Sequence, residues 1–134
     1  MGSIIPKVTV NESWHKILLD DLNVTECKIV FEVTPNDDKN LQGQYHHKEK
    51  RIEIWIHRNL VGRRMTENKK KKIEMRILET LLHEYRHHWQ YTHGKNLVAQ
   101  SYDVDYYKKP IEIDARSYAK SAKVRYHKLV EISK

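Results

Sequence analysis

The spacing of apolar residues predicts a long helix in the second half of the chain. Between residues 66 and 94 they recur every three or four positions, the period of an amphipathic α-helix. We expect this helix to begin near Thr66 and to end at Gly94, because glycine is a good C-cap residue. The stripe that would face the core consists of Ile77, Leu78, Leu81, Leu82, Tyr85 and Trp89.

A second helix is expected to begin at Pro110, because proline is tolerated in the first turn of a helix. Three alanines make one side of this helix small enough to approach another helix closely. The whole apolar stripe is Ile111, Ala115, Tyr118, Ala119, Ala122, Tyr126 and Leu129. The residues between the two helices, 95–109, are polar and rich in tyrosine, so they are expected to form a loop.

The first half of the chain combines a shorter helix with strands. Residues 11–22 carry apolar side chains at helical spacing (Trp14, Ile17, Leu18 and Leu22) behind Asn11 as N-cap. Residues 27–33 are a predicted strand because they are rich in β-forming residues. Residues 51–57 are a second one, since Ile52, Ile54 and Ile56 alternate with polar or amphipathic residues. Residues 35–40 form a loop, and residues 44–48 either pair with strand 51–57 or continue the turn. The fold class is therefore α+β, with a small mixed or antiparallel sheet packed on the long helix.

Composition narrows the class of protein. A chain of 134 residues with 39% hydrophobic residues is expected to form one domain, residues 1–134, around one core. The net charge of +7 favours an acidic partner such as nucleic acid, although Lys69–Lys72 also suits a solvated helix face. No apolar run approaches the roughly 18–20 residues of a membrane span. The start of the chain lacks a secretory pattern, and the single Cys27, a core residue, suits the cytoplasm.

The chemistry of the chain is concentrated at the sequence His83-Glu84-Tyr85-Arg86-His87, which matches HExxH. On a helix, residues i and i+4 lie one above the other, so both imidazoles can bind one zinc ion while Glu84 acts as general base. With Leu78 placed at 0°, His83 and His87 lie near about 140° and 180°, opposite the apolar stripe and on the side of Gln90. Two histidines on that face could also simply be exposed to solvent. Whether they form a metal site therefore depends on a third ligand.

Three residues are candidates for that third ligand. His93 follows His87 at a spacing of six residues. Glu112 lies at the edge of the apolar stripe of the second helix, where a carboxylate is costly unless its charge is compensated. Asp114 lies outside that stripe and suits a supporting role, as acceptor for a histidine N–H. Glu112 is the better ligand of the two carboxylates.

The motifs resemble those of the glutamate-type zincins, or gluzincins. HEYRH is followed some 25 residues later by E-x-x-A-x-x-x-A, as in HtpX-like proteases and ImmA/IrrE-like metallopeptidases. HExRHxxQ with a later P-x-E-x-D-A-x-x-Y-A also resembles small phage-type peptidases. The resemblance implies a minimal zincin-like fold and a zinc peptidase in which the first glutamate, Glu112, is the metal ligand. Arg116 stands where the HtpX-like pattern has aspartate.

Two further patterns include His93. HExxHxxQxxH resembles the metzincins, and the spacing of its three histidines resembles the YbeY-type RNA-processing hydrolases. Both have glycine at the position of Gln90, and the metzincins also have a downstream methionine, whereas the methionines here all lie upstream. A catalytically silent zincin-like module that binds nucleic acid or serves regulation is a third alternative.

The favoured expectation is a peptidase with one catalytic Zn²⁺, held by His83, His87 and Glu112, acting on a peptide or protein. The candidates for a second stabiliser of the oxyanion are Tyr102, Tyr106, Tyr107 and Arg86, and the sequence does not choose among them. Strand 51–57 is expected to be an edge strand that pairs with an extended substrate. Its last residue, His57, is within reach of the site by this reasoning, whereas His46, His47 and His88 are expected not to be ligands.

Overall fold

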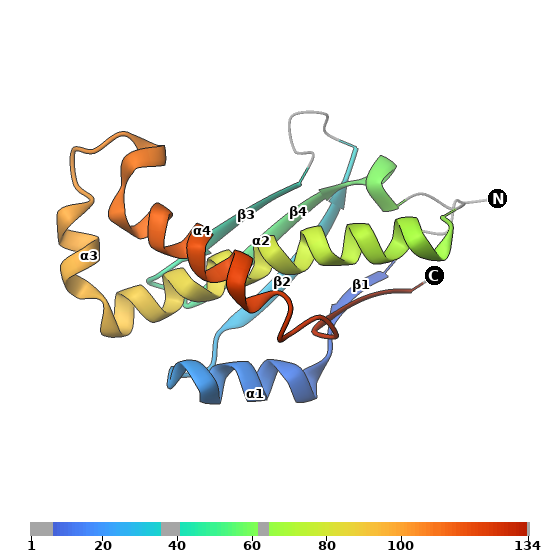
Figure 1. Cartoon of the computed structure of the whole chain (residues 1–134), viewed down its shortest axis with the longest axis horizontal. Coiled ribbons are helices and arrows are strands. Elements are labelled where there is room, and N and C mark those ends of the chain that lie inside the picture. Colours follow the sequence, from blue (N-terminus) through green and yellow to red (C-terminus); the bar gives the residue numbers. More distant parts are fainter. Residues whose placement is uncertain (1–6, 36–40, 62–64, 134) are drawn as a thin grey trace.

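The computed structural model describes residues 7–35, 41–61 and 65–133, and its architecture is α+β as predicted (Figure 1). A long helix, α2 (Glu67–His93), crosses the molecule, with the strands β2, β3 and β4 on one side of it and the helix α4 (Pro110–Ala122) against another. A separate pair of strands, β1 and β5, lies with helix α1 (Glu12–Leu22) at the other end of the sheet layer.

Helix α2 begins and ends where the sequence predicts. The Thr66 hydroxyl accepts a hydrogen bond from the Lys69 N–H (3.2 Å), which caps the first turn, and the Gly94 N–H donates to the Gln90 carbonyl (2.8 Å). The predicted apolar stripe is buried except for Trp89, which is half-buried. Burial is not confined to that stripe, because α4 covers part of the opposite side.

The three-stranded sheet has the order β2 (Lys28–Thr34), β4 (Arg51–His57), β3 (Leu41–His46), with β2 parallel and β3 antiparallel to β4. The expectation that residues 51–57 form an edge strand is therefore wrong. Both edges of β4 are paired, and its three isoleucines have no exposed surface. Residues 44–46 belong to the hairpin partner β3. Among the described residues β2 and β3 are the two edge strands of this sheet, and β3 is the one that packs beside α2.

The strands β1 (Lys7–Val10) and β5 (Val130–Ser133) pair antiparallel and were not expected from the sequence. Four-residue strands are too short to show a clear period, and each depends on the other for its hydrogen bonds. Helix α1 is capped as predicted, by Asn11 accepting from the Ser13 N–H (3.0 Å). Its buried face differs from the prediction, however, since Leu19 is buried and Ile17 is 45% exposed.

Two expectations about the second half are also corrected. Residues 95–109 are not one loop, because they contain the short helix α3 (Lys95–Gln100) and the 3-10 turn η2 (Tyr106–Lys108). Helix α4 begins at Pro110 as predicted but ends at Ala122. Tyr126 and Leu129 are buried from turns beyond the helix, where the chain reverses to bring β5 beside β1.

One hydrophobic cluster contains residues from α1, β4, α2 and α4 as well as from the β1–β5 pair, and it includes Cys27 as expected. The predicted loop at 35–40 lies, apart from Pro35, outside the described residues. No helix within residues 7–35, 41–61 and 65–133 is long and apolar enough to cross a membrane.

Candidate metal centre

Side chains from α2 and α4 converge at one point. The Nε2 atom of His83 lies 2.9 Å from one carboxylate oxygen of Glu112, and the Nε2 atom of His87 lies 2.9 Å from the other. The two imidazole rings are nearly perpendicular, with centroids 4.8 Å apart. Two nitrogens and two oxygens thus meet at a common centre, although Glu112 is 29 residues from His83 and 25 from His87 in the chain.

The alanines of α4 explain this close approach. Ala115 and Ala119 are buried, with 0% and 1% of their surface exposed, and α2 and α4 are in extensive contact. Small side chains let two helix backbones pack closely, so a glutamate in the first turn of α4 reaches α2 directly. Glu112 is 4% exposed, which is rare for a carboxylate without a charged or metal partner.

Charge compensation dominates the electrostatics of the centre. Burial opposes ionisation of Glu112, but hydrogen bonds from His83 and His87 outweigh it and hold the pKa of this carboxyl well below its ordinary value. Burial likewise opposes protonation of His87, yet its contacts with Glu112 and the nearby Glu84 raise its pKa. The centre therefore contains an ionised carboxylate that strongly attracts positive charge. A divalent cation can supply this charge in place of a protonated imidazole.

Glu84 lies beside the same centre but has a different environment. It is 5% exposed, and burial raises its pKa more than the two histidines lower it. Gly43 of β3 packs directly on it, because a Cβ atom built at Gly43 would lie 2.9 Å from Glu84 Cγ and 3.0 Å from Thr80 Cγ2. Glycine is thus required here by close packing, and the edge strand forms one wall of the site.

Two carboxylates compete for the place of third ligand. One oxygen of Glu84 lies with the histidine nitrogens in a group whose members are all within 4.8 Å of one another. Glu112, in contrast, contacts both Nε2 atoms at 2.9 Å with one oxygen each. Glu112 is the better placed of the two for a ligand, because its two oxygens face the Nε2 atoms of both histidines.

A chain of hydrogen bonds fixes the orientation of His87. Gln90 donates through its amide nitrogen to the Ile111 carbonyl (2.8 Å) and to Asp114 (2.9 Å), so its oxygen faces His87 Nδ1 at 2.7 Å. Nδ1 must then carry the proton, and the lone pair of neutral His87 is on Nε2, at the centre. This tautomer is the one that a zinc ion needs, so the donor set fits the metal.

Asp114 therefore acts on His87 through Gln90 and not by the direct contact that the sequence suggested. Its carboxylate is anchored by Arg86, with 2.7 Å from Nε and 3.2 Å from Nη2. Burial opposes ionisation of Asp114, but the hydrogen bonds from Arg86 and Gln90 prevail and lower its pKa. The guanidinium carbon of Arg86 also lies over the Trp89 ring, 3.7 Å from its centroid, so both Asp114 and Trp89 hold the Arg86 side chain in place.

Replacing Asp114 by asparagine is expected to weaken zinc binding by about tenfold, the lower end of the effect of losing a partner of a metal-bound histidine. Without the carboxylate, neither Arg86 nor Gln90 is held by a charge, and His87 loses its fixed orientation. Titration against a competing chelator measures the change. Asp103→Asn, at an exposed position with positive φ that asparagine tolerates, is the matched control. Equal zinc affinities of the two variants would contradict the role assigned to Asp114.

The remaining histidines have partners elsewhere. His93, the alternative ligand, lies 2.7 Å from the Asn23 carbonyl and is not brought to His83 and His87. His88 is fully buried between the Tyr45 hydroxyl (2.6 Å) and the Thr25 carbonyl (2.7 Å), as suits a structural residue. His57 accepts from the Asn59 N–H (3.1 Å) after β4. His46 lies 3.4 Å from Glu53, and His47 stacks on Tyr91.

Among the candidates for a second oxyanion donor, Tyr106 is the best placed. It lines the cavities on both sides of the histidines, and its pKa is raised by burial and by a hydrogen bond to Glu112. Tyr106 is 59% exposed, and Tyr102 and Tyr107 are 74% and 75% exposed. Arg86 is engaged by Asp114. Tyr106 is therefore the tyrosine that can address a group bound at the centre.

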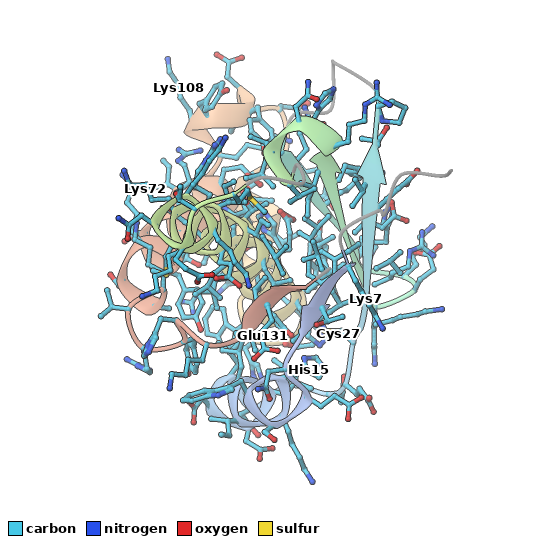
Figure 2. All side chains as sticks on the ribbon, turned by 90° about the vertical axis from the view of Figure 1, so that its right-hand side faces the viewer. Lys7, His15, Cys27, Lys72, Lys108 and Glu131 are labelled. Atoms are coloured by element: carbon cyan, nitrogen blue, oxygen red, sulfur yellow. The ribbon has the colours of Figure 1, made fainter. Side chains whose placement is uncertain are left out.

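The cleft that contains the centre follows the open edge of β3. A cavity of about 670 Å³ lies towards Leu41 and the middle of α2, and one of about 160 Å³ lies towards Tyr45, Tyr91 and Ile111. Gly43, Glu84 and Tyr106 line both. A larger groove of about 830 Å³ between β1 and β2, near the labelled Lys7, His15 and Cys27 (Figure 2), is lined by no residue of this centre. The two smaller cavities are the ones that border the candidate centre.

A family model described only as ":-like" matches residues 27–128, which is more than half of the chain. The chain belongs to this family. The match runs from β2 to beyond α4 and so includes every residue of the candidate centre, while the description of the family names no activity. No curated protein and no solved structure matches the chain.

Proposed function

We propose that the protein is a zinc-dependent peptidase in which His83, His87 and Glu112 hold the metal and Glu84 is the general base. The observation that carries the proposal is the pair of buried carboxylates with different roles: Glu112 bridges the two imidazoles, whereas Glu84 contacts neither as an ion-pair partner and has a raised pKa. A purely structural zinc site usually has four protein ligands and leaves no purpose for such a base.

Zinc at this centre would supply the polarisation of a water molecule and of the scissile carbonyl. Glu84 accepts a proton from the attacking water, since its buried carboxylate lies beside the histidines of the centre. The same carboxyl then donates the proton to the amine nitrogen as the peptide bond breaks. Its burial against Gly43 holds it in place and excludes bulk water from that side.

Tyr106 is proposed to donate a hydrogen bond to the oxyanion that develops on the substrate carbonyl. It belongs to the short turn η2, immediately before the helix that carries Glu112, and it borders both cavities. A raised pKa keeps the phenol protonated at neutral pH, as a donor requires.

The open edge of β3 is proposed to pair with the substrate, in place of strand 51–57. Both flanking cavities are lined by residues of β3, and an extended peptide that adds to a strand edge gains backbone hydrogen bonds regardless of its sequence. The substrate would accordingly be an unfolded or flexible segment of a protein. The buried, single Cys27 is compatible with the cytoplasmic setting that we propose.

The test combines metal analysis with two substrate classes. The purified protein is expected to hold one zinc per chain and to cleave a chemically denatured protein, but not structured RNA, with loss of cleavage when a chelator is added. RNA cleavage that requires zinc, without proteolysis, would favour the YbeY-type alternative. Bound zinc without hydrolysis of either substrate would instead favour the silent binding module.

A further inference from the structure

The cavity on the Leu41 side of the centre has a positive lining. Three cationic side chains border it: Arg76 from α2, and Arg116 and Lys120 from α4. Among the described residues, no acidic side chain lies within ion-pair distance of Arg76 or Lys120. The cavity therefore presents positive charge that the protein itself does not neutralise.

The acidic residues of this cavity are already engaged. Glu79 lies 3.3 Å from Lys123, which offsets its charge, and Glu84 is buried at the proposed catalytic centre. Arg116 is held in place, since its Nη2 donates to the Tyr107 carbonyl (2.6 Å) and its guanidinium lies 5.7 Å from the centroid of the Tyr107 ring. One cation is thus positioned by the turn η2, next to Tyr106.

The positive surface continues along α2 away from His83. Counted at about 100° per residue, Lys69, Lys72 and Arg76 fall within roughly 40° of the direction of His83. All three are exposed. Figure 2 looks along the molecule from the side of the α2 N-terminus and shows Lys72 and Lys108 on the same side, away from the β1–β5 pair. Lys69, Lys72 and Arg76 therefore lie on the same face of α2 as His83, so exposed positive charge continues along the helix from the cleft.

The opposite cavity has a different character. Four of the nine residues that line it are aromatic or aliphatic, namely Tyr45, Tyr91, Tyr106 and Ile111, and its volume is about 160 Å³ against about 670 Å³. Its charged residues belong to the centre itself. An extended chain along β3 would thus meet a small pocket with three tyrosines on one side of the scissile bond and a wider basic channel on the other.

We infer that the basic channel (Arg76, Arg116, Lys120 and the exposed face of α2 up to Lys69) binds aspartate and glutamate side chains of the substrate, so that the protein selects acidic segments. This inference rests on the proposed peptidase function. A peptide antiparallel to β3, the more stable pairing, directs its C-terminal part towards Leu41. The acidic residues are therefore those that follow the cleaved bond.

A polypeptide is favoured over nucleic acid as the occupant of the channel. The channel is bordered by Leu41 and Gly43 of β3, which pairs with only one other strand among the described residues, and an extended peptide can add to such a strand. The aromatic rings that a single-stranded nucleic acid stacks on are scarce there, with Tyr106 and Tyr107 at one end only.

The test measures binding separately from cleavage. Zinc-loaded protein carrying Glu84→Gln is titrated into two fluorescent peptides that differ only in three residues after the expected cleavage site, glutamate in one and glutamine in the other. Both are acetylated and amidated, so that terminal charges do not contribute. The glutamate peptide is expected to bind about five- to tenfold more tightly at low salt, and the difference is expected to shrink at high salt.

The same titration is repeated with Arg76→Gln/Lys120→Gln introduced into the Glu84→Gln protein. This variant is expected to bind both peptides equally, with the affinity for the glutamine peptide unchanged. Lys16→Gln/Lys28→Gln is the matched control, because it removes two exposed charges from α1 and β2. An unchanged preference in the first variant, or an equal loss in the control, would overturn the inference. Tighter binding of a single-stranded oligonucleotide than of the glutamate peptide would also overturn it.

Cleavage of both peptides by the wild-type protein separates the two proposals. Hydrolysis without a glutamate preference contradicts only the acidic channel. Selective binding of the glutamate peptide without hydrolysis supports the channel and contradicts the peptidase. Circular dichroism of each variant confirms that the fold is retained.

Discussion

Replacing Glu112 by alanine is expected to lower the affinity for zinc by more than about 100-fold, since a first ligand contributes at least as much as its supporting residues. Two imidazoles alone would remain, and the structure directs both Nε2 atoms at this carboxylate. Glu112→Gln should have nearly the same effect while preserving the shape of the buried side chain. Metal analysis after dialysis against a weak chelator, with thermal unfolding to verify the fold, provides the measurement.

His93→Ala is the control for this experiment and is expected to retain one zinc per chain, because His93 contacts the Asn23 carbonyl away from the centre. The reverse result, with metal lost in His93→Ala and kept in Glu112→Ala, would show that the ligand assignment is wrong. Loss of metal in Glu84→Gln but not in Glu112→Ala would identify Glu84 as the third ligand, in agreement with the mutual distances of His83, Glu84 and His87.

The second large effect is expected at Glu84. Glu84→Gln should reduce kcat for peptide hydrolysis by about 10²- to 10⁴-fold, because the amide cannot take a proton from the attacking water. Zinc content should remain at that of the wild type. The packing against Gly43 tolerates an amide of the same size, so the loss would reflect the missing proton transfer.

Single-turnover cleavage of a denatured protein, with zinc content measured on the same sample, tests this expectation. Glu49→Gln, an exposed glutamate in the turn between β3 and β4, controls for the removal of one carboxylate. A Glu84→Gln variant that keeps full activity and full zinc content would exclude Glu84 as the general base. A variant that loses both activity and zinc would instead indicate a ligand role.

Local patterns predicted the two helices that form the candidate centre. The first and last residues of α2 follow from the spacing of its apolar residues and from its capping residues. The HExxH motif on that helix then places His83 and His87 on one face. Pro110 marks the first turn of α4 by its own covalent geometry. These properties depend on neighbours three or four positions apart, which the sequence displays directly.

Short or context-dependent elements were not predictable in the same way. The strands β1 and β5 have four residues each and form only because the chain ends meet. The place of β4 in the centre of its sheet depends on two partners from different parts of the chain, and alternating isoleucines suit an edge and a central strand alike. The hydrogen bonds that lead from Arg86 through Asp114 and Gln90 to His87 join two helices whose relative position no local pattern contains.

The sequence by itself determined which residues are candidates for a metal centre and on which helix faces they lie, because a period of 3.6 residues relates side-chain direction to position. The tertiary structure alone decided which of these faces meet. It brought Glu112 between His83 and His87, gave Gln90 the hydrogen bond from His87, and laid Gly43 of the edge strand on Glu84. Those contacts arise from the packing of small alanines and from the order of the strands, and both depend on residues far apart in the chain.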